Sequence, residues 1–147
     1  MQVLFVCLGN ICRSPAAEAA FRARAGGTHR IDSAGTADWH VGKPPYGPMR
    51  AAAAARGFDL STLRARQIAV ADFNDFDLII GMDASNIEAI EQLRPAGNTT
   101  PVRLFTDYAP DTGMDHVPDP YHTRDFDAAL DLIEACSAGL ARALARA

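Results

Sequence analysis

The chain has 147 residues, which is the usual length of one domain and enough to bury a hydrophobic core. Its 48% hydrophobic and 22% charged residues are typical of a soluble globular protein, and its net charge of −4 excludes a general basic field for nucleic acid or an anionic membrane. The apolar start is too short for a signal peptide or a membrane span, and three cysteines suggest no disulfide framework, so we expect a monomeric, cytoplasmic, single domain over residues 1–147.

Apolar runs alternate with helical patterns along the chain. β-Strands are predicted over residues 2–7, 30–33, 78–82 and 102–105. Helices are predicted over residues 14–25, 46–56 and 84–93, and from residue 125 to the end. This alternation favours a three-layer α/β fold, in which a four-stranded parallel sheet carries helices on both faces. Ligands of such folds bind beyond the carboxyl ends of the strands.

The loop after the first predicted strand reads CLGNICRSP over residues 7–15. Gly9 and Asn10 tolerate positive φ, so the loop can curl with its N–H groups pointing inward, and Pro15 suits the first turn of a helix. Such a nest of amides at a helix N-terminus binds an anion. Arg13 adds a planar cation that suits two phosphate oxygens, and these positive surroundings favour the thiolate of Cys7.

This loop predicts an enzyme that hydrolyses phosphate monoesters, with Cys7 as the nucleophile. The predicted phosphate-binding residues are Leu8, Gly9, Asn10, Ile11, Cys12, Arg13 and Ser14. A cysteine at the end of a buried strand is more often a core residue, but packing alone does not explain the full pattern. An ATP-binding loop is excluded, because no Gly-Lys-Ser or Gly-Lys-Thr stands at the required spacing.

Together with the residues 7–15, an ordered set of motifs resembles the low-molecular-weight protein-tyrosine phosphatases over nearly the whole chain. The set continues with Glu18 and Phe21, 32–36, Trp39, 65–67, Met82, Asp83, Ser85, Asn86 and 119–121. The resemblance implies hydrolysis of phosphotyrosine in proteins without a metal or cofactor. Cys7 would attack phosphorus while Asp119 protonates the leaving oxygen, and Asp119 would then activate the water that hydrolyses the phosphocysteine. Without the resemblance, Asp119 would be interpreted as an ordinary turn aspartate.

The resemblance also implies residues that surround the reacting groups. The expected supports of the loop are Asn10, Ser14 and Ser33, and the expected substrate cleft comprises Ile11, Trp39, Tyr121 and His122. Trp39 and Tyr121 would flank an aromatic ring. Ile11 would favour phosphotyrosine, since relatives that act on phosphoarginine have threonine at this position of the loop.

The other two cysteines have different interpretations. Cys12 either fills the loop or forms a disulfide with oxidised Cys7, and the second interpretation is favoured. Cys136 is expected to lie in the core. The sequence departs from the family pattern at Leu63, where many relatives have a histidine that supports the loop asparagine, and at Arg56, where some relatives have histidine.

Three other functions remain open at this stage. A thioredoxin-coupled arsenate reductase shares the fold and loop, but residues 80–86 lack the additional cysteines that its chemistry requires. A non-catalytic phosphoprotein-binding module would be expected to have lost its nucleophile, arginine or acid, and all three are present. A zinc site is disfavoured by the spacing of the three cysteines and of the scattered histidines His29, His40, His116 and His122.

Overall fold

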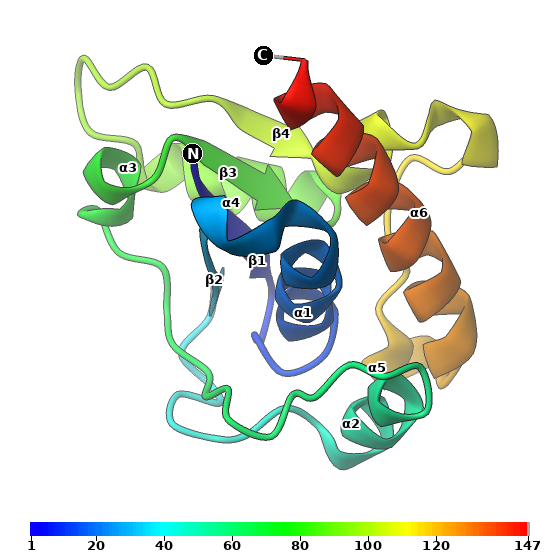
Figure 1. The fold of residues 1–147 in the computed structure, drawn as a ribbon. Coiled ribbons are helices and arrows are strands. Elements are labelled where there is room, and N and C mark those ends of the chain that lie inside the picture. The colour runs from blue at the N-terminus through cyan, green and yellow to red at the C-terminus, as the bar shows by residue number, and fades with distance from the viewer. Residues whose placement is uncertain (147) are drawn as a thin grey trace.

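A computed structural model describes residues 1–146 and shows a four-stranded, all-parallel sheet between two layers of helices (Figure 1). The strands are β1 (Gln2–Cys7), β2 (Arg30–Gly35), β3 (Leu78–Gly81) and β4 (Val102–Leu104). Their order across the sheet is β2-β1-β3-β4, so β1 is an inner strand with partners on both sides. Its last residue, Cys7, pairs with Gly35 at the carboxyl edge of the sheet.

Six α-helices are seen in the described part of the chain: α1 (Arg13–Ala25), α2 (Gly47–Ala54), α3 (Asp72–Asp75), α4 (Ala84–Leu93), α5 (Pro120–Thr123) and α6 (Phe126–Ala145). Short 3₁₀ turns cover Gly26–Thr28, Phe105–Tyr108 and Pro110–Thr112. None of the described helices combines the length and apolar character that crossing a membrane requires.

The side chains of β1 alternate between two hydrophobic cores, because successive residues of a strand point to opposite faces. Val3 and Phe5 belong to the larger core, which α1 and α6 cover. Leu4 and Val6 belong to the smaller core, which α3 and α4 cover. Burial on both faces explains why this strand is an unbroken apolar run. It also holds Cys7 rigidly at the end of the strand.

The predicted fold class is confirmed, and the helix at 84–93 has the predicted bounds. Strand β2 extends two residues further than predicted, to Gly35, whereas β3 and β4 each stop one residue earlier. The second predicted helix is shorter, and the last one begins at Phe126 and ends at Ala145. The prediction missed α3 and α5, because a four-residue helix is too short to show a hydrophobic period.

Candidate active site

The loop between β1 and α1 is held from outside by its carbonyl groups. The carbonyl oxygens of Cys7, Leu8 and Ile11 accept hydrogen bonds from backbone N–H groups of residues 36, 37 and 46, at 2.8–3.0 Å. A peptide that turns its carbonyl outward turns its N–H inward, and the N–H of Asn10 donates to Cys7 Sγ at 3.3 Å. A Cβ on Gly35 would lie 2.8 Å from the Leu8 carbonyl oxygen, so only glycine lets the loop approach β2.

Asn10 fixes the turn of this loop. Its φ of 57° lies in the left-handed region, where asparagine is tolerated better than most residues. Its Oδ1 accepts from the Arg66 N–H at 3.0 Å, and its Nδ2 donates to Ser14 Oγ at 2.7 Å and Ser33 Oγ at 3.0 Å. Gly9 has no positive φ, contrary to the use that the sequence suggested for it. Instead, a Cβ on Gly9 would lie 3.0 Å from the ring of His40.

A buried chain of hydrogen bonds leads from this asparagine to the nucleophile. Because the amide nitrogen of Asn10 can only donate, both serine hydroxyls must give their own protons to other acceptors. The Ser33 hydroxyl donates to Glu18 Oε1 at 2.7 Å. The Ser14 hydroxyl lies 3.0 Å from Cys7 Sγ and 3.4 Å from the Ala34 carbonyl, so the sulfur is its nearer acceptor.

Glu18 anchors the far end of this chain. Its carboxylate also pairs with Arg22 at 2.9 Å, one turn further along α1. Burial raises the pKa of Glu18 above its ordinary value, against the opposing hydrogen bonds from Ser33 and Arg22.

The guanidinium of Arg13 is buried and held from two directions. Its Nη1 donates to Asp83 Oδ2 at 2.7 Å and to the Val117 carbonyl at 2.9 Å, and its Nη2 lies 3.7 Å from Asp119 Oδ2. Burial alone would lower the pKa of Arg13, but the nearby Cys7 and the two aspartates outweigh burial and raise it. These contacts fix the plane of the guanidinium beside the phosphate loop.

Asp83 links this arginine to α4. Its Oδ1 accepts from the Asn86 N–H at 2.8 Å, and Asn86 Oδ1 accepts in return from the Asp83 N–H at 3.2 Å, so the two residues form a capping box. Burial would raise the pKa of Asp83, but the hydrogen bonds from Arg13 and from the Asn86 N–H lower it below its ordinary value.

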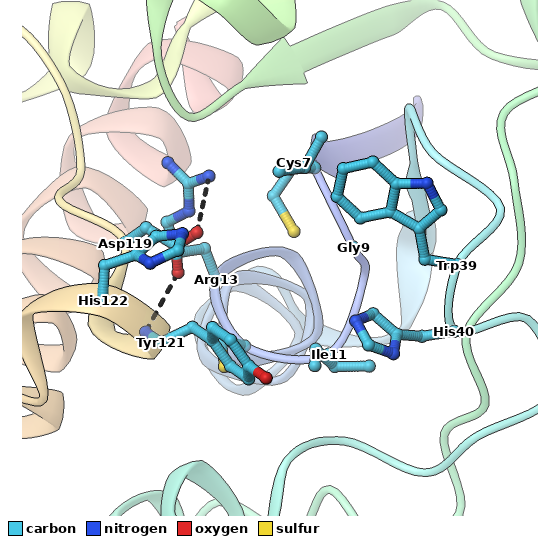
Figure 2. A pocket seen from close by; sticks show the side chains of 11 residues that line it. Cys7, Gly9, Ile11, Arg13, Trp39, His40, Asp119, Tyr121 and His122 are labelled. Carbon is cyan, nitrogen blue, oxygen red and sulfur yellow. Dashed lines mark hydrogen bonds and ion pairs between the residues drawn. The ribbon is translucent and has the colours of Figure 1, made fainter.

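Asp119 caps the N-terminus of α5 rather than standing in an irregular loop. Its Oδ1 accepts from the Tyr121 N–H at 3.1 Å, which leaves Oδ2 directed toward Arg13 (Figure 2). Pro120 occupies the first position of this helix, where the missing N–H costs nothing. Asp119 is the one carboxylic acid among the residues that line the pocket in the described chain.

The predicted site residues meet at one pocket with a volume of about 110 Å³ (Figure 2). Its lining comprises Cys7, Leu8, Gly9, Ile11, Cys12, Arg13, Trp39, His40, Asp119, Tyr121 and His122. The floor of the pocket is formed by the buried side chains of Cys7, Ile11, Cys12 and Arg13, whereas Trp39 is 66% exposed and Tyr121 is 43% exposed. Figure 2 shows the rings of these two residues on opposite sides of the Cys7 sulfur. Asn10, Ser14 and Ser33 lie outside the lining, in the buried chain described above.

The three cysteines are free thiols, and all are buried. Burial, followed by the charges of Cys7 and Asp119, raises the pKa of Cys12 to about 12. The redox role of Cys12 stays a prediction. Cys136 lies in the larger core, as expected. Within residues 1–146, no group of three or more His, Cys, Asp or Glu side chains is placed to hold a metal ion.

The two departures from the family pattern have structural explanations. Leu63 packs on the larger core, and the backbone N–H of Arg66 supports the loop asparagine directly. Arg56, just beyond the end of α2, forms ion pairs with three acids of α6 at 2.7–3.2 Å. Neither residue belongs to the lining of the pocket.

Sequence reasoning gave no role to three residues of this region. Glu18 and Asp83 belonged to the motif set, but a spacing does not reveal that one anchors Ser33 and the other holds Arg13. His40 was set aside as one scattered histidine among four. Its position next to Trp39, in a segment rich in glycine and proline, was the signal that could have identified it.

Comparison with known proteins gives a consistent result. Residues 2–147 match the profile of the family described as low molecular weight phosphotyrosine protein phosphatase. The low molecular weight protein-tyrosine-phosphatase YfkJ of Bacillus subtilis is 42% identical over 139 residues, covering 91% of this chain and 89% of that protein. The corresponding phosphatase of Schizosaccharomyces pombe is 44% identical over 128 residues, covering 83% and 81%.

Two solved structures extend this result to the fold. The crystal structure of YfkJ superposes with a TM-score of 0.94 at 39% identity, covering 99% of this chain and 95% of that one. The crystal structure of a Drosophila arginine phosphatase superposes with a TM-score of 0.91 at 30% identity, covering 98% of each chain.

Proposed function

Because the chain belongs to the low molecular weight phosphotyrosine protein phosphatase family and is a protein-tyrosine phosphatase, we propose that it acts through a phosphocysteine on Cys7, with Arg13 binding phosphate and Asp119 transferring the proton. The observation that supports this assignment best is the convergence of a thiol, a guanidinium and a carboxyl group on one pocket. These groups come from the end of β1, the start of α1 and the N-cap of α5.

In the first step, Cys7 Sγ attacks phosphorus in line with the leaving phenol oxygen. The inward amides of residues 8–13 and the Nη2 edge of Arg13 bind the equatorial oxygens, where negative charge is stabilised through the transition state. Asp119 gives its proton to the departing oxygen, so the leaving group is a neutral phenol. The bonding electrons of the P–O bond leave with that oxygen, and a phosphocysteine remains.

In the second step, a water molecule attacks the phosphocysteine from the side that the phenol has vacated. Asp119, now a carboxylate, takes a proton from this water, and Cys7 leaves as a thiolate. The Ser14 hydroxyl, 3.0 Å from Sγ, donates to that thiolate and makes it a better leaving group. All charge stabilisation in this scheme comes from side chains and amides of the chain itself.

The walls of the pocket support phosphotyrosine in proteins as the substrate. An aryl ring placed between Trp39 and Tyr121 would bring its phosphate to the floor of the pocket. An arginine phosphatase shares this fold, so the fold alone does not select between the two phosphorylated side chains. The apolar side chain of Ile11 in the pocket favours the aromatic phosphate ester over the charged guanidinium phosphoramidate.

The experiment compares two aryl phosphates that differ in leaving group: a phosphotyrosine peptide and p-nitrophenyl phosphate, whose phenolate needs no acid. Cys7→Ser should lose turnover of both substrates. It should still bind vanadate, which the fluorescence of Trp39, the only tryptophan, can report. Asp119→Ala should slow the phosphotyrosine peptide by about 100-fold and the nitrophenyl ester far less, because a positioned acid contributes most when the leaving group is basic.

Phosphoserine and phosphoarginine peptides provide the specificity control, and both should be poor substrates. If Cys7→Ser kept more than about a tenth of the wild-type rate, a loss of less than roughly 1.4 kcal/mol in the barrier, Cys7 would not be the nucleophile. Equal losses of both aryl esters in Asp119→Ala would transfer the acid role to His40 or His122, the titratable neighbours in the lining.

A further inference from the structure

Within residues 1–146, two non-glycine residues have positive φ, and each belongs to a segment that contributes to the pocket. Asn10 turns the phosphate loop, as described above. Arg124, with φ 63°, is the residue that ends α5, the short helix whose N-cap is Asp119. A glycine would adopt this backbone without strain, so the presence of arginine calls for a reason in its side chain.

The side chain of Arg124 turns back onto two aromatic rings. Its guanidinium carbon lies 5.4 Å from the ring centre of Tyr46 and 5.6 Å from that of Phe126. Its Nη1 donates to the Tyr46 hydroxyl at 3.0 Å. A guanidinium stacked on aromatic faces and hydrogen-bonded at its edge is a favourable arrangement for arginine, and lysine cannot reproduce it.

Tyr46 connects this helix end to the phosphate loop. Its backbone N–H donates to the Ile11 carbonyl at 2.8 Å, so the residue is tied to the floor of the pocket. Its ring centre lies 5.1 Å from that of Tyr121, a residue of α5. Arg124 and Tyr46, which we call the Arg124–Tyr46 clamp, therefore join the helix that carries the acid to the loop that carries the nucleophile.

The helix α5 depends on such contacts for its position. It has four residues, and a helix of one turn is not stable by itself. Its backbone joins the two ends rigidly, because the Arg124 N–H donates to the Pro120 carbonyl at 2.9 Å and the Thr123 N–H to the Asp119 carbonyl at 3.1 Å. A shift at Arg124 is thus transmitted to Asp119 at the other end.

We propose that Arg124 and Tyr46 are positioning residues for the general acid, which hold Asp119 at the distance from Cys7 that proton transfer requires. This inference rests on the proposed role of Asp119. A different role for Arg124 would be to attract the phosphate dianion by its charge, and such a role would affect every phosphate ester equally. The two roles therefore differ in their dependence on the leaving group.

Arg124→Gly is the main variant, since glycine keeps the left-handed backbone and removes only the side chain. It should slow turnover of the phosphotyrosine peptide by about tenfold, which is a fraction of the roughly 100- to 10,000-fold that a positioned acid contributes. The rate with p-nitrophenyl phosphate should change by less than about twofold. Tyr46→Phe, which removes only the hydroxyl acceptor, should show the same pattern more weakly. Arg142→Ala, on the exposed side of α6, is the control and should change neither rate.

A second comparison uses the Asp119→Ala background. If the clamp acts through Asp119, adding Arg124→Gly there should cause no further loss with either ester, because the group being positioned is already gone. Equal losses of both esters that persist in this background would overturn the proposal, as would unchanged rates in Arg124→Gly. Failure of the proposed function would be recognised separately, because Asp119→Ala alone would then cause no loss that depends on the leaving group.

Discussion

The floor and the walls of the pocket are built in opposite ways. On the floor, Cys7 and Arg13 are each 3% exposed, and Asn10 and Ser14 beneath them are no more exposed; each of these four side chains has a hydrogen-bond partner inside the protein. On the walls, Trp39 stands largely in solvent. The floor thus exists in its working geometry before a substrate arrives, as electrostatic stabilisation of a transition state requires.

The walls have a different task, because they meet whichever protein carries the phosphotyrosine. They come from the segment 36–46, which contacts the floor through backbone hydrogen bonds, and from α5, which contacts it through the ion pair of Asp119 with Arg13. The two walls meet at the rings of Tyr46 and Tyr121. We therefore expect substitutions on the floor to reduce turnover of all substrates, and substitutions on the walls to change the choice among them. The following variants test that division, starting with the largest effect.

Arg13→Lys is expected to have the largest effect. Lysine keeps the charge but lacks the planar fork that can bind Asp83 on one edge and phosphate on the other. We expect kcat/KM to fall by roughly 100- to 1,000-fold for phosphotyrosine and nitrophenyl esters alike, the usual loss for one donor to a developing oxyanion. Steady-state kinetics on both esters would measure it. Arg24→Lys, an exposed position of the same helix, is the matched control, and a larger loss with one ester than with the other would contradict the division.

Asp83→Asn tests how strongly the floor is anchored. Asparagine can still cap α4, but it loses the charge that faces Arg13, so we expect the free energy of unfolding to fall by about 2 kcal/mol at neutral pH. Urea unfolding would measure this loss. Glu88→Gln, an exposed position on the same helix, should change it little.

The loss in Asp83→Asn should depend on pH in a defined direction. The pKa of Asp83 is lowered in the folded state, so its contribution is present above the ordinary aspartate pKa of about 3.9 and disappears as the pH falls through the folded value. Wild type and variant should therefore converge in stability in acid. A difference between them that stays constant from neutral pH down to below about 3 would contradict the ion pair as its source.

Trp39→Ala is expected to have the smallest effect. With one wall removed, the aryl ring loses contact area, and kcat/KM for the phosphotyrosine peptide should fall by about five- to tenfold, roughly 1 kcal/mol. The rate with a small alkyl phosphate should stay the same, since the floor is untouched. Val41→Ala, an exposed residue of the same segment, is the control. An equal loss with the alkyl ester would place Trp39 among the residues that maintain the floor.

The sequence alone predicted the fold class and most of the pocket. The long elements were predictable because β1 and α4 carry continuous or periodic apolar patterns. The residues of the floor were predictable because they are nearly contiguous, so one motif names them together. The prediction of Asp119 depended on the family resemblance, since an aspartate between prolines is by itself an ordinary turn.

The missed features depend on contacts between distant segments. Nothing near Asp83 in the sequence indicates that it faces Arg13, 70 positions earlier. The left-handed Arg124 was equally hidden, because arginine has no preference for that conformation and only its stacking on Tyr46 explains it. Gly9 illustrates the opposite error, where a glycine suggested a positive φ but serves to admit the ring of His40.

The hydrogen bond from Arg13 to the Val117 carbonyl spans 104 positions of the chain and has a consequence for biosynthesis. At the usual translation rates of about 5–20 residues per second, the carbonyl that holds the arginine leaves the ribosome roughly 5–20 seconds after the arginine itself. Asp119 follows two residues later. The phosphate loop is therefore translated first and receives its distant partners last, so a chain interrupted before residue 117 carries the nucleophile without an anchored arginine or an acid. We therefore expect a translation product that ends before residue 117 to have no phosphatase activity.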